Sequence, residues 1–134
     1  MEPLIIKATE DTPEIYLDAE KGIFSITKSS LPENAVEFYR PIIDWINAYA
    51  ANPNPETVFE FNVEYLNTAS SKQIFEVIMA INRILNKGDV TIRWHYDTID
   101  EDMLGLGTRF SNLVSVNFEF IEYESEDEDM DFSI

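Results

Sequence analysis

The chain has 134 residues, of which 45% are apolar and 13% aromatic, and this is enough to build one domain around one core. It has no cysteine, which excludes disulfides, thiolate zinc sites and a cysteine nucleophile and suits a cytoplasmic protein. The formal net charge of −17 disfavours binding to nucleic acid and to anionic membrane surfaces.

Hydrophobic periodicity predicts six strands and three helices. Three strands come first, and helices then alternate with strands, over 3–8, 14–18, 23–28, 31–50, 58–66, 71–88, 89–96, 100–114 and 116–123. A turn-forming "AEKG" between the second and third strands indicates an antiparallel hairpin, whereas strand–helix alternation indicates right-handed crossovers. We therefore predict an α/β fold: a mixed sheet with an antiparallel start and β-α-β crossovers, with about three helices packed on it.

The chain divides by charge into two parts. Residues 1–123 contain all the predicted elements and form the predicted single domain. The stretch from Glu122 to the end holds seven acids and no base. Dense like charge of this kind is typical of a solvated segment, so we predict an acidic, mobile tail over 124–134.

Three elements carry more detailed expectations. Pro41 lies inside the helix 31–50 and cannot donate to the carbonyl of Glu37, which predicts a kink or a one-turn break. In the strand 58–66, one apolar face should hold Phe59, Phe61, Val63 and Tyr65. In the helix 71–88, the stripe that packs on the sheet should contain Ile74, Val77 or Ile78, Ile81 and Leu85.

Enzyme signatures are scarce. "GLGTRF" lacks the third glycine and the preceding strand of a dinucleotide-binding loop. In "TASSK", the residue three before Lys72 is Ala69, so the S-x-x-K pattern of a serine nucleophile is not met. His95 is the single histidine, which makes a zinc site or a catalytic triad a poor interpretation.

An acidic cluster follows the strand that ends near residue 96. Asp97, Asp100, Glu101 and Asp102 offer carboxylate oxygens, which suit Mg²⁺ or Ca²⁺. The same residues suit the first turn of a helix, where the helix dipole favours negative charge. A small acidic metal-dependent enzyme that uses Asp97–Asp102 is therefore the alternative to a helix start without bound metal.

The stretch "NTASSK", residues 67–72, lies where a strand should pass into a helix. Thr68 or Ser70 could cap that helix by accepting a hydrogen bond from a free backbone N–H. The same turn would lie at the carboxyl edge of the sheet, where α/β proteins place their sites. Phosphorylation of an exposed hydroxyl would add about −1.5 to −2 charge beside the helix. The residues alone leave both the cap and the modified site open.

The blocks "SSLPENAVEFYRPIIDWINAY", "VEYLNTASSKQIFEVI" and "IRWHYDTIDEDM" resemble, together and in this order, the SiaC family of bacterial regulatory phosphoproteins. The resemblance covers residues 9 to about 121. It implies a domain similar to anti-sigma-factor antagonists of the STAS type, with no cofactor, no metal and no catalysis of its own. Function would then come from switching between protein partners.

The resemblance also implies the partners and the site. Thr68 would be phosphorylated by a protein kinase and restored by a PP2C-type phosphatase. The unphosphorylated form would bind and activate a diguanylate cyclase, which raises cyclic di-GMP and favours biofilm growth. The partner-binding residues would be Asn67, Thr68, Ser70, Ser71 and Lys72. An adaptor without a switch is the remaining alternative.

Overall fold

The structure of the protein, a computed structural model, describes residues 1–125. Apart from its first two residues, the predicted tail over 124–134 lies outside the described part of the chain. The described elements follow the predicted order. They are β1 (Leu4–Ile6), β2 (Glu14–Asp18), β3 (Ile23–Ser30), α1 (Ala35–Ala50), β4 (Glu56–Leu66), α2 (Thr68–Arg83), the 3-10 helix η1 (Ile84–Asn86), β5 (Asp89–Asp97), α3 (Glu101–Leu113) and β6 (Asn117–Tyr123).

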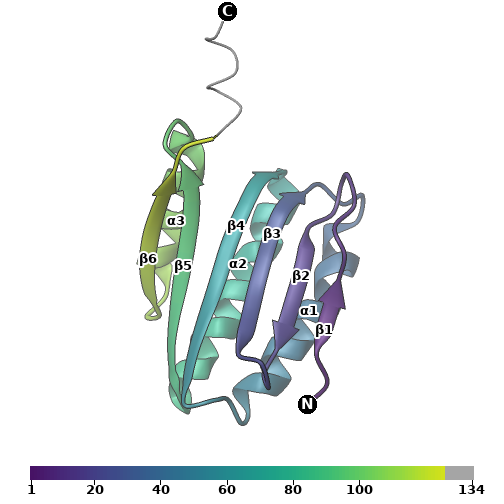
Figure 1. Cartoon of the computed structure of the whole chain (residues 1–134), viewed down its shortest axis with the longest axis vertical. Helices are drawn as coiled ribbons and strands as arrows, with labels where there is room; N and C mark the ends of the chain where they lie inside the picture. Colours follow the sequence, from purple (N-terminus) through teal and green to yellow (C-terminus); the bar gives the residue numbers. More distant parts are fainter. Residues whose placement is uncertain (126–134) are drawn as a thin grey trace, which may run out of the picture.

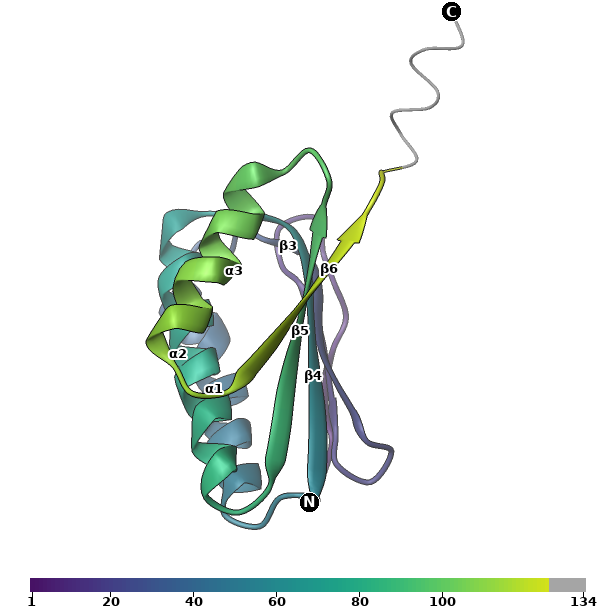
Figure 2. The ribbon, with the colours of Figure 1, turned by 90° about the vertical axis from the view of Figure 1, so that its left-hand side faces the viewer.

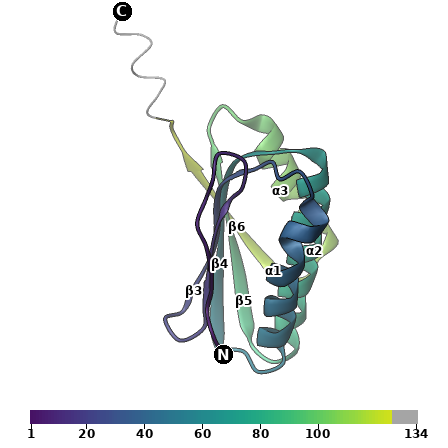
Figure 3. The same cartoon turned by 90° about the vertical axis from the view of Figure 1, so that its right-hand side faces the viewer.

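The strands form one six-stranded sheet in the order β1-β2-β3-β4-β5-β6 (Figure 1). β1, β2 and β3 pair antiparallel, and β3, β4, β5 and β6 pair parallel. Each parallel crossover moves one strand along the sheet in the same direction, so crossovers of one hand place their helices on the same face. Figures 2 and 3 show α1, α2 and α3 on one side of the sheet. The predicted mixed α/β fold is confirmed.

The core lies between this sheet and its helix layer. Alternate side chains of β4 and β5 face the helices, among them the buried Phe59, Phe61 and Trp94. In the hairpin, Ile15 pairs with Ile26, and both are fully buried. The sheet therefore buries the apolar half of each alternating strand, as the period-two pattern predicts.

No helix of residues 1–125 covers the opposite face of the sheet, which carries a polar network. Glu60 on β4 accepts from Arg93 at 3.0 Å and contacts His95 at 2.6 Å, both on β5. The Arg93 guanidinium also lies 3.5 Å from Glu119 on β6. The single histidine thus joins neighbouring strands.

One β4 prediction is wrong because of a bulge. Lys28 pairs with Val63 but Ser29 pairs with Tyr65, so Glu64 is an extra residue in the ladder. Beyond an extra residue the alternation of side chains reverses. Tyr65 therefore leaves the buried face, and 69% of it is exposed.

The stripe predicted on the second long helix is confirmed at three of its positions and wrong at the last. Ile74, Ile78 and Ile81 are fully buried, but Leu85 is 38% exposed. The chain tightens into the 3-10 turn of η1 after Arg83, and a 3-10 turn has three residues instead of 3.6. The shorter turn changes the directions of the side chains, so that Ile84 points into the core in place of Leu85.

Helix α1 continues through Pro41, so the one-turn break that was one of the two expectations does not occur. Both Pro41 and Glu37 are exposed, so water can satisfy the carbonyl that lacks its helical donor. The buried side of the same helix, with Tyr39, Ile42 and Ile46, holds it on the sheet. Packing therefore outweighs the local cost of the proline.

Helix α3 lies close to the sheet because Gly107 has no side chain. A Cβ atom there would come 2.5 Å from Nε1 of Trp94. That same indole nitrogen donates to the carbonyl of Met103 at 3.0 Å. The glycine therefore permits the contact between α3 and β5.

All three helices begin at the same edge of the sheet, where the parallel strands end, at the top of Figure 1. Each start is capped by a side chain that accepts from a backbone N–H three residues later: Asn34 in α1, Asn67 in α2 and Asp100 in α3. This edge positions the turn that the sequence marked as a candidate site.

Candidate functional site

The turn between β4 and α2 is capped by Asn67. Its Oδ1 accepts from the backbone N–H of Ser70 at 2.8 Å, and its carbonyl accepts from the N–H of Ser71 at 3.0 Å. The prediction that Thr68 or Ser70 caps the helix is wrong, because Asn67 precedes both and its short amide side chain reaches the orphan donor. Thr68 is instead the first residue of the helix.

Ser70 is turned into the protein. Its side chain is fully buried, and its Oγ accepts from Oγ of Ser30, at the end of β3, at 2.9 Å. The same Ser30 oxygen lies 2.6 Å from the hydroxyl of Tyr39 on α1. Three buried hydroxyls therefore join α1, β3 and α2 below the turn, and Ser70 offers no surface to a partner in this conformation.

The remaining residues of the turn lie at the surface. Thr68 and Lys72 are exposed and Ser71 is half-buried. The Ser71 hydroxyl donates to the carbonyl of Thr68 at 2.8 Å. The structure therefore brings Asn67, Thr68, Ser71 and Lys72 together at the carboxyl edge and separates Ser70 from them.

The acids after β5 have structural partners. Asp97 accepts from the N–H of Ile99 at 3.2 Å, and Asp100 caps α3 by accepting from the N–H of Met103 at 3.0 Å. Within residues 1–125, no three His, Asp or Glu side chains are placed to hold a metal ion. The geometry therefore supports the helix-start interpretation of Asp97 and Asp100.

The charge at this edge is negative. Burial raises the pKa of Tyr123 at the end of β6, and the nearby charges of Asp97, Glu64 and Asp100 raise it further. Carboxylates that raise the pKa of a tyrosine act by disfavouring a second negative charge beside them. These carboxylates therefore disfavour a further negative charge near the end of β6.

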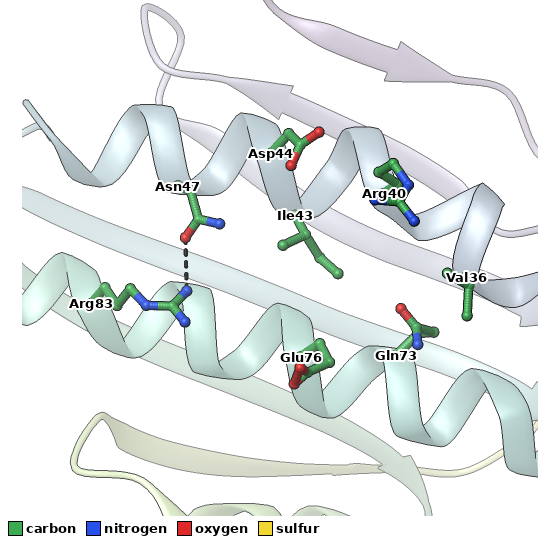
Figure 4. Close-up of a pocket in the computed structure, with 8 residues that line it drawn as sticks. All are labelled: Val36, Arg40, Ile43, Asp44, Asn47, Gln73, Glu76 and Arg83. Atoms are coloured by element: carbon green, nitrogen blue, oxygen red, sulfur yellow. Dashed lines mark hydrogen bonds between the residues drawn. The ribbon is translucent and has the colours of Figure 1, made fainter.

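A groove runs along α2 on the side of α1. Figure 4 shows side chains from both helices facing one another, with Arg83 donating to Asn47 at 2.8 Å. Arg40 and Arg83 line the groove together with Asp44 and Glu76. The charges of these two bases and two acids cancel, so the groove presents no net charge that would attract a charged ligand.

Reasoning from the sequence missed Tyr65, Ser30 and Tyr39. Tyr65 is three residues before Thr68 and 69% exposed, but the alternating pattern of β4 placed it inside because a bulge leaves no local signal. Ser30 bonds Ser70, and Tyr39 bonds Ser30, only in the folded chain, and a lone serine or tyrosine far along the sequence gives no sign of such a contact.

These features define a mixed α/β domain with helices on one face of its sheet and an exposed hydroxyl turn at the carboxyl edge. The family model of SiaC family regulatory phosphoproteins matches residues 6–123, which is most of the chain. The chain belongs to the SiaC family of regulatory phosphoproteins, which confirms the resemblance seen in the sequence motifs.

Individual relatives agree with this assignment. An uncharacterized protein of Pseudomonas aeruginosa (strain UCBPP-PA14) is 31% identical over 119 residues, which cover 88% of this chain and 94% of the relative. The solved structure of SiaC of Pseudomonas aeruginosa has a TM-score of 0.82 and 28% identity, and covers 92% of this chain and 100% of that one.

A further solved structure holds diguanylate cyclase SiaD in complex with its activator SiaC from Pseudomonas aeruginosa. It matches with a TM-score of 0.81 and 29% identity, over 90% of this chain and 99% of that one. Signal transduction through protein–protein contact and control of cyclic di-GMP are thus functions found in this family. In this chain, no helix of residues 1–125 is long and apolar enough to span a membrane.

Proposed function

We propose that this protein is a non-catalytic, cytoplasmic regulator that binds and activates a diguanylate cyclase and is switched by phosphorylation of Thr68. A protein kinase adds the phosphate, a PP2C-type phosphatase removes it, and the unphosphorylated form is the one that binds. The observation that carries the proposal is the exposure of Thr68 at the first position of α2, in a chain whose solved relative is described as the activator of such a cyclase.

The charge at the turn supports a switch. The first turn of α2 contains no acid, and the charged residue of the proposed contact surface, Lys72, is basic, so the unphosphorylated turn carries no negative charge where a partner would contact it. Phosphate adds about −1.5 to −2 charge at the edge of the sheet that also holds Glu64, Asp97 and Asp100. A partner must then desolvate this charge on binding, and a penalty of about 2.8 kcal/mol lowers affinity a hundredfold.

The proposed contact surface is the exposed part of the turn together with Tyr65. The sequence motif gave Asn67, Thr68, Ser70, Ser71 and Lys72, and we retain all but Ser70, which is buried. Tyr65 joins them because a large, exposed aromatic side chain beside a site is the kind of residue that anchors interfaces.

Phosphosite mapping tests the modified residue. The protein is purified from its own cells, and the hydroxyls of residues 67–71 are examined by mass spectrometry. We expect phosphate on Thr68, loss of that phosphate in Thr68→Ala, and its retention in the matched variant Ser71→Ala. Phosphate on Ser71 alone would move the site within the turn, whereas an unmodified turn under all growth conditions would remove the switch.

Binding tests the direction of the switch. The partner is a diguanylate cyclase from the same cells, and its affinity is measured by calorimetry. Thr68→Ala should bind as the wild type does, and Thr68→Glu should bind more weakly, although one carboxylate carries less charge than a phosphate. Equal affinity of Thr68→Glu and Thr68→Ala would favour an adaptor without a switch.

A further inference from the structure

We propose that Ser30 and Tyr39 are positioning residues that select the acceptor hydroxyl of the turn, by holding Ser70 inside the fold while Thr68 stays exposed. This inference rests on the proposed phosphorylation of the turn and concerns how the fold restricts it. In "NTASS", the hydroxyls of Thr68 and Ser70 lie only two residues apart. Their sequence positions alone therefore do not determine which one a kinase phosphorylates.

The direction of the hydrogen bonds is fixed by counting protons. Ser30 has one hydroxyl proton, and it donates this proton to Oγ of Ser70 at 2.9 Å. Tyr39 must therefore be the donor in its 2.6 Å contact with Ser30. Burial raises the pKa of Tyr39 to about 12, so its hydroxyl keeps the donated proton at neutral pH.

Ser30 holds the turn on both sides of Thr68. Its carbonyl accepts from the backbone N–H of Asn67 at 3.2 Å, one residue before the threonine, and its hydroxyl bonds Ser70, two residues after it. Ser30, Tyr39 and Ser70 are each fully buried. Among residues 1–125, no buried side-chain nitrogen or oxygen lacks a partner, so the chain of hydroxyls is complete.

Removal of the Ser30 hydroxyl would break this chain at its centre. Tyr39 and Ser70 would both lose a buried partner, and an unsatisfied buried hydroxyl gains by turning toward water. The first turn of α2 would then open more often and expose Ser70. A kinase that reads this turn would find a second acceptor beside Thr68.

The experiment compares Ser30→Ala and Tyr39→Phe with a matched control, Tyr49→Phe. Tyr49 also lies on α1, is buried, and bonds a buried hydroxyl, Oγ1 of Thr57, at 2.7 Å. The Tyr49–Thr57 bond lies near the start of β4, whereas the bonds of Tyr39 and Ser30 lead to Ser70 in the first turn of α2. Tyr49→Phe therefore removes the bond to Thr57, together with the one that Tyr49 accepts from the N–H of Asn54 at 3.1 Å, away from the turn of α2.

Two readouts are used on the full chain. The first is hydrogen exchange of the backbone amides of Ser70 and Ser71 by NMR, which reports opening of the turn without any kinase. We expect about tenfold faster exchange in Ser30→Ala, a ratio that corresponds to about 1.4 kcal/mol, and a smaller increase in Tyr39→Phe. In Tyr49→Phe, the exchange rates of these two amides relative to the other amides of α2 should be unchanged.

The second readout is phosphosite mapping of the same variants from their own cells. Phosphate on Ser70 should rise at least tenfold over the wild type in Ser30→Ala and should remain at the wild-type level in Tyr49→Phe. In the background Ser70→Ala, the further change Ser30→Ala should add little to the exchange rate, because Ser30 acts on the turn through Ser70.

The outcomes separate this inference from the proposed function. Unchanged exchange in both Ser30→Ala and Tyr39→Phe, or phosphate confined to Thr68 in both, would overturn the inference and leave Thr68 as the switch. If Ser30→Ala does not fold, Tyr39→Phe decides alone, since it keeps the aromatic ring in the core. A turn without phosphate in every variant would refute the proposed function, whereas the exchange rates would still show whether Ser30 holds the turn.

Discussion

Helices α2 and α3 begin at the same edge of the sheet with the same capping geometry, but they differ in charge. Asn67 accepts from an N–H three residues on at 2.8 Å, and Asp100 does the same at 3.0 Å. The first turn of α3 holds Glu101 and Asp102, and that of α2 holds no acid. The first turn of α2 thus forms without an acid, so a phosphate added there would introduce a negative charge that the unmodified turn lacks.

The two helices also differ in how they are attached. Helix α2 buries a stripe of large side chains, including Ile74, Ile78 and Ile81. Helix α3 buries fewer residues and approaches β5 through Gly107, which lies against Trp94. A phosphate at the start of α2, as proposed, would therefore be added to a firmly packed helix, whose position is set by its buried stripe rather than by its first turn.

The largest expected effect tests this packing. Ile81→Ala should cost about 2–5 kcal/mol of unfolding free energy, because it leaves a cavity under α2. Leu85→Ala is the matched control, since Leu85 is 38% exposed and its loss should cost much less. Urea unfolding of both variants measures the difference, and equal costs would contradict the assigned packing of α2 and η1.

The attachment of α3 is tested by adding a methyl group. Gly107→Ala places Cβ atoms within 2.5 Å of Trp94, and overpacking of this kind costs about 1–3 kcal/mol. Gly105→Ala serves as control, because a Cβ there meets only Arg109 Nη1 at 3.6 Å and alanine favours the helix. Thermal unfolding should show a loss for the first variant and a neutral or stabilising effect for the second.

The contact surface is tested by truncating Tyr65. Tyr65→Ala should lower affinity for the diguanylate cyclase about tenfold or more, as expected when an aromatic anchor of an interface is removed. Ile5→Ala removes another exposed apolar side chain, 51% against 69%, on the edge strand β1, and should leave affinity unchanged. A loss in Ile5→Ala without one in Tyr65→Ala would move the interface to the β1 edge of the sheet.

The smallest effect comes from making the two helix starts alike. Asn67→Asp retains the capping oxygen and adds the charge that α3 already has, so it should stabilise the protein by about 0.3–1 kcal/mol at low salt. Asp100→Asn should lose a similar amount. Raising the ionic strength should reduce both effects, and insensitivity to salt would mean that geometry rather than charge distinguishes the two caps.

Much of this fold could be predicted from the sequence, because alternation and helical periodicity report which side of each element is buried. The wrong predictions occur where the period changes. The bulge at Glu64 places Tyr65 on the exposed face of the strand. The 3-10 turn of η1 buries Ile84 in place of Leu85.

The candidate turn was also visible in the sequence, since Asn, Thr and Ser gather at a strand end. Local chemistry could not tell which of these residues caps the helix, because each has a suitable oxygen. Asn67 is the cap because it directly precedes the first helical residue. The burial of Ser70 involves Ser30 and Tyr39, which are 40 and 31 positions from it in the chain and join it in one chain of hydrogen bonds only after folding. Tertiary contacts therefore decide which hydroxyl is exposed.

The most direct test of the central claim is the affinity of the diguanylate cyclase for two preparations of this protein, one unmodified and one fully phosphorylated on Thr68. Titration calorimetry at one salt concentration gives both dissociation constants. We expect binding of the unmodified protein and about a hundredfold weaker binding of the phosphorylated one, which corresponds to about 2.8 kcal/mol. Equal affinities, or tighter binding of the phosphorylated protein, would contradict it.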